Sequence, residues 1–413
     1  MAQLADGLAI AIVVALPWSS SVVSILVVLW LLALLPTLKA GDVWREVATV
    51  AGGLPVALAL LAALGMLWAD VTWPERLGGL DSFLKLLLIP LLLVQFRRSN
   101  RGRLILGGYL VSCSVLLALS FVSLHWPHLI APGEDLGVPI KNAATQCAEF
   151  ILCTFALLFI AIERLRRGKT LAAGAMLALA LAFLVNVSVV ATAQAIFGLP
   201  FIVTVTVALL FVLLAIKTLS GKHALMSIGA VAILCAAAWL ASPEIRTRTM
   251  AAWNGIQSEP GRWLGSRPGF WQKSLTFIGD RPLFGHGTGS VQSLYARSVA
   301  GPGQATVTIN PHQQTLAIGM QLGLAGMAVL WAMWTAHLML FRGGTLPAWI
   351  GLMIVTQTVV GSFAESNLFD FTWGWSYVFG VGIAGGMVRR LAETKIEFNS
   401  DYVRDGAAAN EHC

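Results

Sequence analysis

One histidine stands at the polar end of an apolar segment, in the stretch "NPHQQTLAIGMQLGLAG" at residues 310–326. Asn310 is a favoured N-cap, Pro311 suits the first helical position, and Gln313 can reach back as in a capping box, so we expect a helix to begin here. His312 would then lie in the first turn, where the helix dipole disfavours imidazolium and attracts anions. A neutral imidazole beside an anion site can accept a proton from a hydroxyl group. We therefore predict that His312 is a general base, the alternative being a structural histidine at the membrane interface.

Three glycines follow His312 on the same face of the expected helix. At about 100° per residue, Gly319, Gly323 and Gly326 fall within roughly 40° of the azimuth of His312. Small residues let helices approach closely in membranes, so we predict that this face packs against another element. Gln313 is expected to cap the helix or to contact the substrate.

Several cations lie where they could bind an anion. Lys85, in "DSFLKLLLIPLLL", is an intramembrane lysine, which usually faces a cavity or a partner. Alternatively, the Lys85 side chain could extend to the membrane interface or pair with Asp81. A long polar loop carries further candidates for anion binding. Alternatively, its arginines could simply attract anionic lipid head groups. They are Arg246, Arg248, Arg262 and Arg267, with Trp271 beside the last.

The elements that must position these residues are membrane helices. The 413 residues are 57% hydrophobic and 11% charged, with a mean hydropathy of +0.78. Soluble chains carry about a quarter charged residues. Apolar runs of roughly 17–25 residues recur, each long enough to cross the hydrocarbon core, and they predict an all-α polytopic membrane protein with about twelve helices. The expected spans are 4–17, 20–38, 47–68, 78–96, 104–124, 146–163, 170–187, 198–216, 223–241, 312–340, 345–363 and 371–388.

The charge distribution predicts the topology. With both termini in the cytoplasm, most of the 27 Lys and Arg residues fall on the cytoplasmic side, as the positive-inside rule requires. We expect nine helices in 1–241, a long periplasmic loop with short helices in 242–311, three helices in 312–390 and a polar cytoplasmic tail in 391–413. A loop of that length usually has a function.

Other chemistries lack their motifs. The five cysteines show no CxxC spacing, which argues against a thiolate metal site. "RRGKT" at 166–170 has Glu163 where a phosphate loop needs glycine, and there is no Asp-x-Asp pair for a metal and a nucleotide sugar. We expect no cofactor, no metal and no nucleic-acid partner.

Three segments together resemble a known family. They are His312-Gln313 followed after nine residues by Gly323-x-x-Gly326, "SRPGFWQKSLTFIGDRPLFGHGTGS" at 266–290, and "GSFAESNLFD" at 361–370. The pattern is similar to that of the bacterial O-antigen ligases, within a superfamily that also contains O-antigen polymerases. The resemblance is strongest over about 262–326 and otherwise rests on hydropathy and topology.

The resemblance implies a GT-C-like glycosyltransferase of the bacterial inner membrane, acting on its periplasmic side without metal. The donor would be a glycan on undecaprenyl diphosphate, the acceptor lipid A–core, and membrane lipid would surround both. In the family the histidine activates the acceptor and periplasmic arginines bind the diphosphate, roles that His312 and Arg267 match. Many relatives carry a Ser-Arg pair where this chain has "VVATAQAIFG" at 189–198, and Gln194 cannot supply that cation.

Further polar residues on the outer face are secondary candidates. Glu365 and Asp370 could orient an acceptor sugar or cap a short loop. His286 lies among glycines and is expected to be structural. Lys141 and Asn142, in a second outer loop, could touch donor sugars.

Two functions compete with ligation. A polymerase would extend the glycan on its own lipid carrier, and the sequence separates it poorly from a ligase. A transporter or flippase would need ionisable residues at the bilayer midplane and related halves. The polar residues instead gather in one outer loop, which favours a transferase over a transporter. Because the base would act from the side opposite the leaving diphosphate, we expect inversion at the anomeric carbon.

Overall fold

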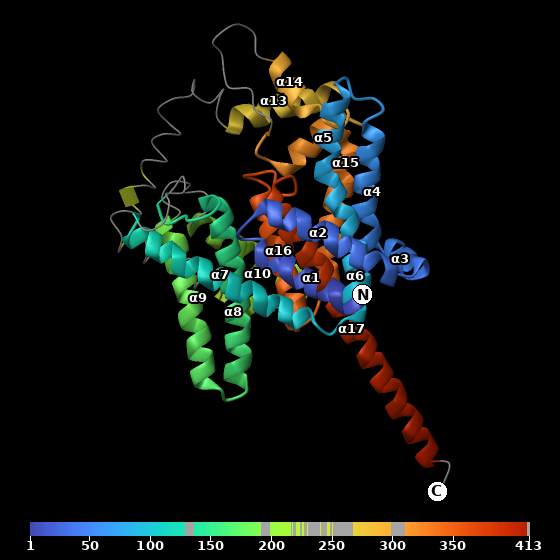
Figure 1. Cartoon of the computed structure of the whole chain (residues 1–413), viewed down its shortest axis with the longest axis vertical. Coiled ribbons are helices and arrows are strands. Elements are labelled where there is room, and N and C mark those ends of the chain that lie inside the picture. Colours follow the sequence, from blue (N-terminus) through green and yellow to red (C-terminus); the bar gives the residue numbers. More distant parts are fainter. Residues whose placement is uncertain are drawn as a thin grey trace.

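The computed structural model describes residues 1–128, 136–190, 199–215, 267–298 and 310–410, with short pieces between 217 and 250; side chains are described as far as residue 394. The regular structure of these segments is helical (Figure 1). The helices are α1 (Ala2–Ala15), α2 (Ser20–Leu34), η1 (Leu35–Thr37), α3 (Ala40–Val47), α4 (Val50–Gly65), α5 (Trp73–Leu84), η2 (Lys85–Leu87), α6 (Leu88–Arg98), α7 (Gly102–His125), α8 (Ala143–Arg166), α9 (Thr170–Val190), α10 (Leu199–Ala215), α13 (Arg267–Asp280), α14 (Val291–Arg297), α15 (Gln314–Leu340), α16 (Leu346–Gly361) and α17 (Phe371–Asn410).

The chain is a multi-pass membrane protein. Six described helical segments are long and apolar enough to span a bilayer, or seven if the bent pair α3–α4 is one span. The twelve predicted spans are not all reproduced. Three apolar helices are only 10–17 residues long, and most of the predicted span 223–241 lies outside the described residues. The six segments are Ser20–Thr37, Trp73–Arg98, Gly102–His125, Ala143–Arg166, Thr170–Val190 and Gln314–Leu340.

The predicted span 47–68 corresponds to α4, except at its first residues. Its first residue belongs to α3, which meets α4 at an angle of 87°. Thr49 begins α4 as its N-cap, where Oγ1 accepts from the amide of Gly52 at 3.2 Å. Glu46 of α3 is only 1% exposed and pairs with Arg97 of α6 and Arg389 of α17. This polar anchor explains why α3 bends away instead of extending the span (Figure 1).

Two short helices from the predicted outer loop cover one end of the bundle. α13 and α14 lie together above α15 in Figure 1. They share a small apolar core with the first turns of α15, so the prediction of short helices in this loop is confirmed for the described part. That core contains Phe270, Ile278, Val291, Leu294, Tyr295, Leu316 and Met320.

The last helix runs further than its apolar sequence. α17 begins at Phe371 and continues to Asn410, where the sequence predicts a polar tail after residue 390. Its first half packs on α6 and α16, and its second half projects from the bundle (Figure 1).

Candidate active site

The start of α15 differs from the prediction. The helix begins at Gln314, and Gln313 is its N-cap, with a side chain that accepts from the amide of Leu316 at 2.5 Å. The predicted N-cap at Asn310 is therefore wrong, and Gln313 caps the helix as its N-cap, not as the third residue of a capping box. His312 precedes the helix in the left-handed region, with φ of 53°. The helix-dipole argument for a neutral His312 consequently loses its basis.

The carboxylate of Glu365, and not the helix dipole, determines which nitrogen of His312 carries the proton. Its Nδ1 lies 2.8 Å from Oε2 and 3.0 Å from Oε1 of Glu365. Because a carboxylate only accepts hydrogen bonds, Nδ1 must carry the proton in this pair. In the neutral ring, Nε2 then has the free lone pair and is the atom that can take up a proton.

Asn310 fixes both members of the pair. Its Nδ2 donates to Oε1 of Glu365 at 2.5 Å, and its Oδ1 accepts from the backbone amide of His312 at 2.9 Å. The hydroxyl of Ser366 also donates to Asn310 Oδ1, at 2.6 Å. The segment after α16 is thereby tied to the turn before α15. Backbone contacts reinforce the link, because Gln314 donates its amide to the carbonyl of Ser362 at 3.0 Å.

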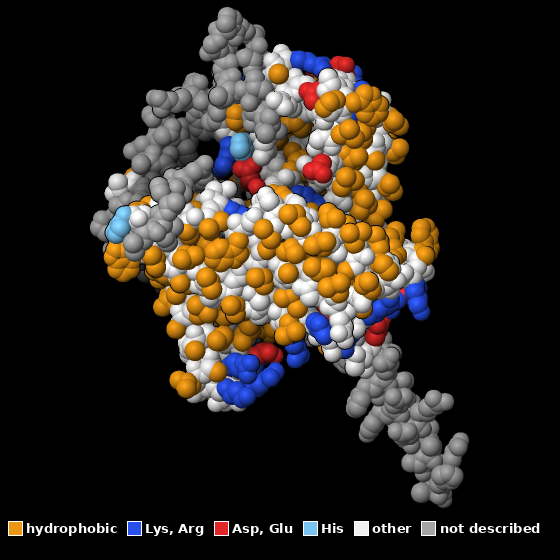
Figure 2. Space-filling view, in the orientation of Figure 1, with side chains coloured by type: hydrophobic (Ala, Val, Ile, Leu, Met, Phe, Trp, Pro, Cys, Tyr) orange, Lys and Arg blue, Asp and Glu red, His pale blue; other side chains and the backbone are white. Residues whose placement is uncertain are grey.

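Arg267 completes the charged cluster. As the first residue of α13, it places Nη2 3.9 Å from Oε2 of Glu365. Phe270, one turn later, has its ring centroid 6.2 Å from that of His312. Basic, acidic and histidine side chains lie together in a hollow beneath α13 in Figure 2.

The electrostatics keep Glu365 ionised. Burial by itself would raise the pKa of the carboxyl, but hydrogen bonds from His312 and Ser366 and the charge of Arg267 hold the pKa below its ordinary value. A carboxyl with a lowered folded-state pKa stabilises the fold fully above its unfolded pKa of about 4.3. This contribution is lost as the pH falls through the lower folded-state value, so the carboxylate is in place throughout the neutral range.

Gly323 breaks α15 where the outer loop docks. Its φ of 63° interrupts the helix, leaving backbone groups on both sides without helical partners. The turn after α13 supplies them: the amides of His286 and Gly287 donate to the carbonyls of Met320 and Gln321 at 2.9 and 2.8 Å. In return, the amide of Leu324 donates to the carbonyl of Pro282 at 2.7 Å. The loop that carries Arg267 therefore packs against α15 at Gly323, where the sequence predicted packing against another element.

The other two glycines differ in their surroundings. A Cβ at Gly319 would lie 2.7 Å from Ile278 of α13, so this position also allows α13 to approach closely. A Cβ at Gly326 would meet Leu322 and Ile318 of its own helix. Close packing between elements is thus evident at Gly319 and Gly323.

Gly323→Ala is expected to destabilise the protein. A Cβ there would lie 2.4 Å from the backbone carbonyl carbon of Leu283, in addition to the strain of a positive φ, which costs on the order of 1–3 kcal/mol. Thermal unfolding in detergent should show a lower melting temperature. Gly279→Ala in α13, where a Cβ meets nothing within 4 Å, is the matched control and should unfold like wild type. Equal melting temperatures for both variants would contradict the docking role of Gly323.

Lys85 makes a different contact from those predicted. It is 8% exposed, and Nζ donates to the backbone carbonyl of Asp370 at 3.0 Å, not to Asp81. Gly374 leaves the space that the ammonium occupies, since a Cβ there would lie 2.3 Å from Nζ. Lys85 thus holds the junction between the Glu365 segment and α17, and binding of a substrate anion such as the diphosphate by Lys85 stays a prediction.

Lys141 and Asn142 have structural contacts. Lys141 donates to the carbonyl of Leu16 and, at 2.6 Å, to the hydroxyl of Thr372. Desolvation lowers the pKa of this amine. Asn142 caps α8 by accepting from the amide of Thr145 at 2.9 Å. Contact of either residue with a donor sugar remains a prediction.

The remaining candidates are spread more widely. Trp271 packs on the core of α13 and α14, and its buried Nε1 has no hydrogen-bond partner among the described residues. Arg246 donates to the carbonyl of Leu240 at 2.8 Å. His286 is 2.8 Å from the carbonyl of Phe277, in keeping with a structural role. Arg248, Arg262 and Gln194 lie outside the described residues.

The described side chains contain no group of three His, Cys, Asp or Glu residues that could hold a metal ion. Sequence reasoning had weighed Glu365 only as a secondary candidate and had missed Asn310 as a site residue. The quoted segment 361–370 marked the region, but nothing in it indicated that Glu365 would contact a histidine 53 residues earlier.

Residues 195–331 match the family model Wzy_C, described as O-antigen ligase. The match covers about a third of the chain and includes Arg267, His312 and the three glycines, whereas Glu365 lies beyond it. No curated protein was found to match the chain. Over that part, the chain is similar to a family that includes both ligases and polymerases.

Proposed function

We propose that this protein transfers O-antigen glycan from undecaprenyl diphosphate to lipid A–core, with inversion at the anomeric carbon. The observation that carries the proposal is the His312–Glu365 pair, held by Asn310 beside Arg267 within a hollow of the membrane protein. The O-antigen ligase match supports the class of reaction and implies lipid-linked glycans as substrates.

The pair supplies a base for the acceptor. The acceptor hydroxyl donates its proton to Nε2 of His312 while its oxygen forms the new bond to the anomeric carbon. The bond from that carbon to the diphosphate oxygen breaks, and the diphosphate leaves with the electron pair. Glu365 accepts from Nδ1 throughout and stabilises the imidazolium that forms, as carboxylates do in other catalytic triads. General-base assistance of this kind contributes about 10²–10⁴ to the rate.

Arg267 is the proposed cation for the departing diphosphate. Its guanidinium can bind a phosphate through two parallel hydrogen bonds, which a lysine ammonium cannot reproduce. Its contact with Glu365, at 3.9 Å, is long enough for a phosphate to replace it.

Arg267→Lys is expected to weaken donor binding despite its unchanged charge. Losing one hydrogen bond to a charged group costs about 1.5–3 kcal/mol, so the KM for the lipid-linked donor should rise roughly 10- to 100-fold. Initial rates at varied donor concentration give the measurement. Arg297→Lys, at a surface pair with Asp70, is the matched control. A donor KM within twofold of wild type in the Arg267 variant would move diphosphate recognition to other residues.

The site is proposed to face the periplasm, in a bacterial inner-membrane protein with both termini cytoplasmic. Gln292→Cys, on α14, should then react with a membrane-impermeant thiol reagent once the outer membrane is permeabilised. Lys169→Cys, between α8 and α9, should react only after the inner membrane is lysed. The reverse labelling pattern would contradict this orientation.

A deletion strain distinguishes ligase from polymerase. Loss of a ligase leaves free core on a lipopolysaccharide gel while long lipid-linked chains accumulate. Loss of a polymerase leaves core that carries a single repeat. We expect the first pattern, because the spacing of His312, Gln313, Gly323 and Gly326 favours the ligases, and the second pattern would overturn ligation.

A further inference from the structure

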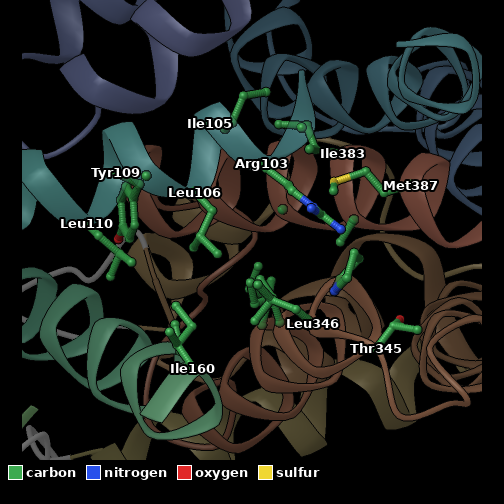
Figure 3. Close-up of a pocket in the computed structure, with 18 of the residues that line it drawn as sticks. Arg103, Ile105, Leu106, Tyr109, Leu110, Ile160, Thr345, Leu346, Ile383 and Met387 are labelled. Atoms are coloured by element: carbon green, nitrogen blue, oxygen red, sulfur yellow. The ribbon is translucent and has the colours of Figure 1, made fainter. Parts of the chain in front are cut away.

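A second cavity opens at the end of the bundle opposite the His312 site. Its volume is about 900 Å³, near the upper limit of about 300–1,000 Å³ for small-molecule sites. It lies between α7, α8, α16 and α17 (Figure 3). Gly344 and Thr345, just beyond the C-terminal end of α15, line its rim, whereas His312 precedes the N-terminal end of the same helix. The two sites are therefore separated by the length of a membrane-spanning helix.

The rim of this cavity is strongly basic. Arg103 of α7, Arg164 of α8 and Arg390 of α17 line it, together with Arg167 and one acid, Glu163. Glu163 pairs with Arg167 at 3.4 Å. Among the described side chains, the other three arginines have no acidic partner within salt-bridge distance. The rim thus retains a net positive charge for a ligand to neutralise.

The walls below the rim are apolar. Leu106 and Leu110 of α7 face Ile160 of α8 and Leu346 of α16 across the open space, as Figure 3 shows, and Ile383 of α17 also lines the cavity. A ligand that matches both parts needs an anionic head and a long hydrocarbon portion. A basic pocket between membrane helices, on the face that holds most of the basic residues, suits an anionic lipid head group.

We propose that this cavity binds one anionic phospholipid, with its phosphate at Arg103, Arg164 and Arg390 and acyl chain along Leu106, Leu110 and Ile160. The charge at the rim favours this occupant over a zwitterionic lipid, whose head group has no net charge. The apolar walls favour it over free phosphate. This lipid site is distinct from the glycan-transfer site and does not depend on the proposed function.

Native mass spectrometry of the full-length protein tests whether the rim arginines select an anionic head group. Protein released from micelles containing equal amounts of dioleoyl phosphatidylglycerol and dioleoyl phosphatidylcholine should retain one phosphatidylglycerol preferentially. Each cation near an anionic lipid contributes about fivefold in affinity, so the double variant Arg164→Ala/Arg390→Ala should reduce that preference about 25-fold. Arg166→Ala, on the same helix but outside the cavity lining, is the matched control and should keep it.

A cavity-filling substitution tests whether the acyl chain lies between the apolar walls. Gly107 lines the cavity, and a Cβ there meets nothing within 4 Å, so Gly107→Leu adds bulk without a clash at its first atom. It should abolish retention of phosphatidylglycerol, while Gly174→Leu, equally unobstructed on α9 and outside the lining, should not. Equal retention of both lipids, equal losses in the paired variants, or displacement of the lipid by millimolar inorganic phosphate would each overturn the proposal.

Discussion

His312→Asn is expected to reduce glycan transfer by about 10²–10⁴, the usual contribution of a general base, while the protein remains folded and binds donor. Asparagine is the informative replacement because His312 has a φ of 53°, a conformation that asparagine tolerates better than other non-glycine residues. Alanine at this position would combine loss of the base with backbone strain. The asparagine amide can also donate to Glu365, so the surrounding hydrogen bonds need not be lost.

The measurement is single-turnover transfer with saturating donor, alongside donor binding and melting temperature for the same sample. His125→Asn, an exposed histidine at the end of α7, is the matched control and should be fully active. A stable His312→Asn protein with wild-type turnover would remove His312 from the chemistry.

Glu365→Gln is expected to reduce turnover about as much as His312→Asn does, because it changes the tautomer of His312. Asn310 Nδ2 and the backbone amide of Ser366 both donate to Oε1 of Glu365, so a glutamine would place its carbonyl oxygen there. Its NH₂ group would then face Nδ1 of His312, which would have to accept instead of donate. The proton would move to Nε2, and the atom facing the acceptor could no longer serve as the base.

The pattern of kinetic constants distinguishes this role from a structural one. Turnover should fall while the KM for donor stays close to wild type, because Glu365 acts on the base and not on the diphosphate. Asp70→Asn removes an exposed carboxylate paired with Arg297 and should be nearly neutral, as surface pairs contribute little. A Glu365→Gln variant with normal turnover would show that the pair does not set the protonation of His312.

The sequence predicted the apolar helix after His312 better than the conformation and the contacts of His312 itself. Hydropathy located the apolar helix after it, but the preference of asparagine for N-cap positions led to a predicted N-cap at Asn310, three residues before the observed one. The structure uses Gln313, and Asn310 bonds to Glu365 instead. Long-range pairing of this kind has no periodicity along the chain, so local patterns could not reveal it.

The helical break at Gly323 was equally inaccessible to local reasoning. Helical spacing placed Gly319, Gly323 and Gly326 on one face, as if the helix continued unbroken. A glycine at φ of 63° and a helical glycine look the same in sequence. What decides between them is the turn at 282–289, whose backbone groups satisfy those exposed by the break.

The membrane helices show where hydropathy succeeds and where it does not. Long apolar runs such as those in α7, α8 and α9 were predicted within a few residues of their observed ends. The amphipathic α3 was not predicted, because residues 39–46 lie between two apolar runs; its position depends on Glu46 contacting Arg97 and Arg389. A carboxylate paired across three helices is a tertiary feature that composition does not encode.

Reconstituted transfer tests the central proposal most directly. Purified protein would be incubated with undecaprenyl-diphosphate-linked glycan and lipid A–core in excess chelator and without ATP, and the product linkage determined by NMR. We predict glycan attached to lipid A–core with its anomeric configuration inverted, and no such product with His312→Asn. Glycan that is lengthened on its own lipid carrier, or transfer that retains the anomeric configuration, would contradict the proposal.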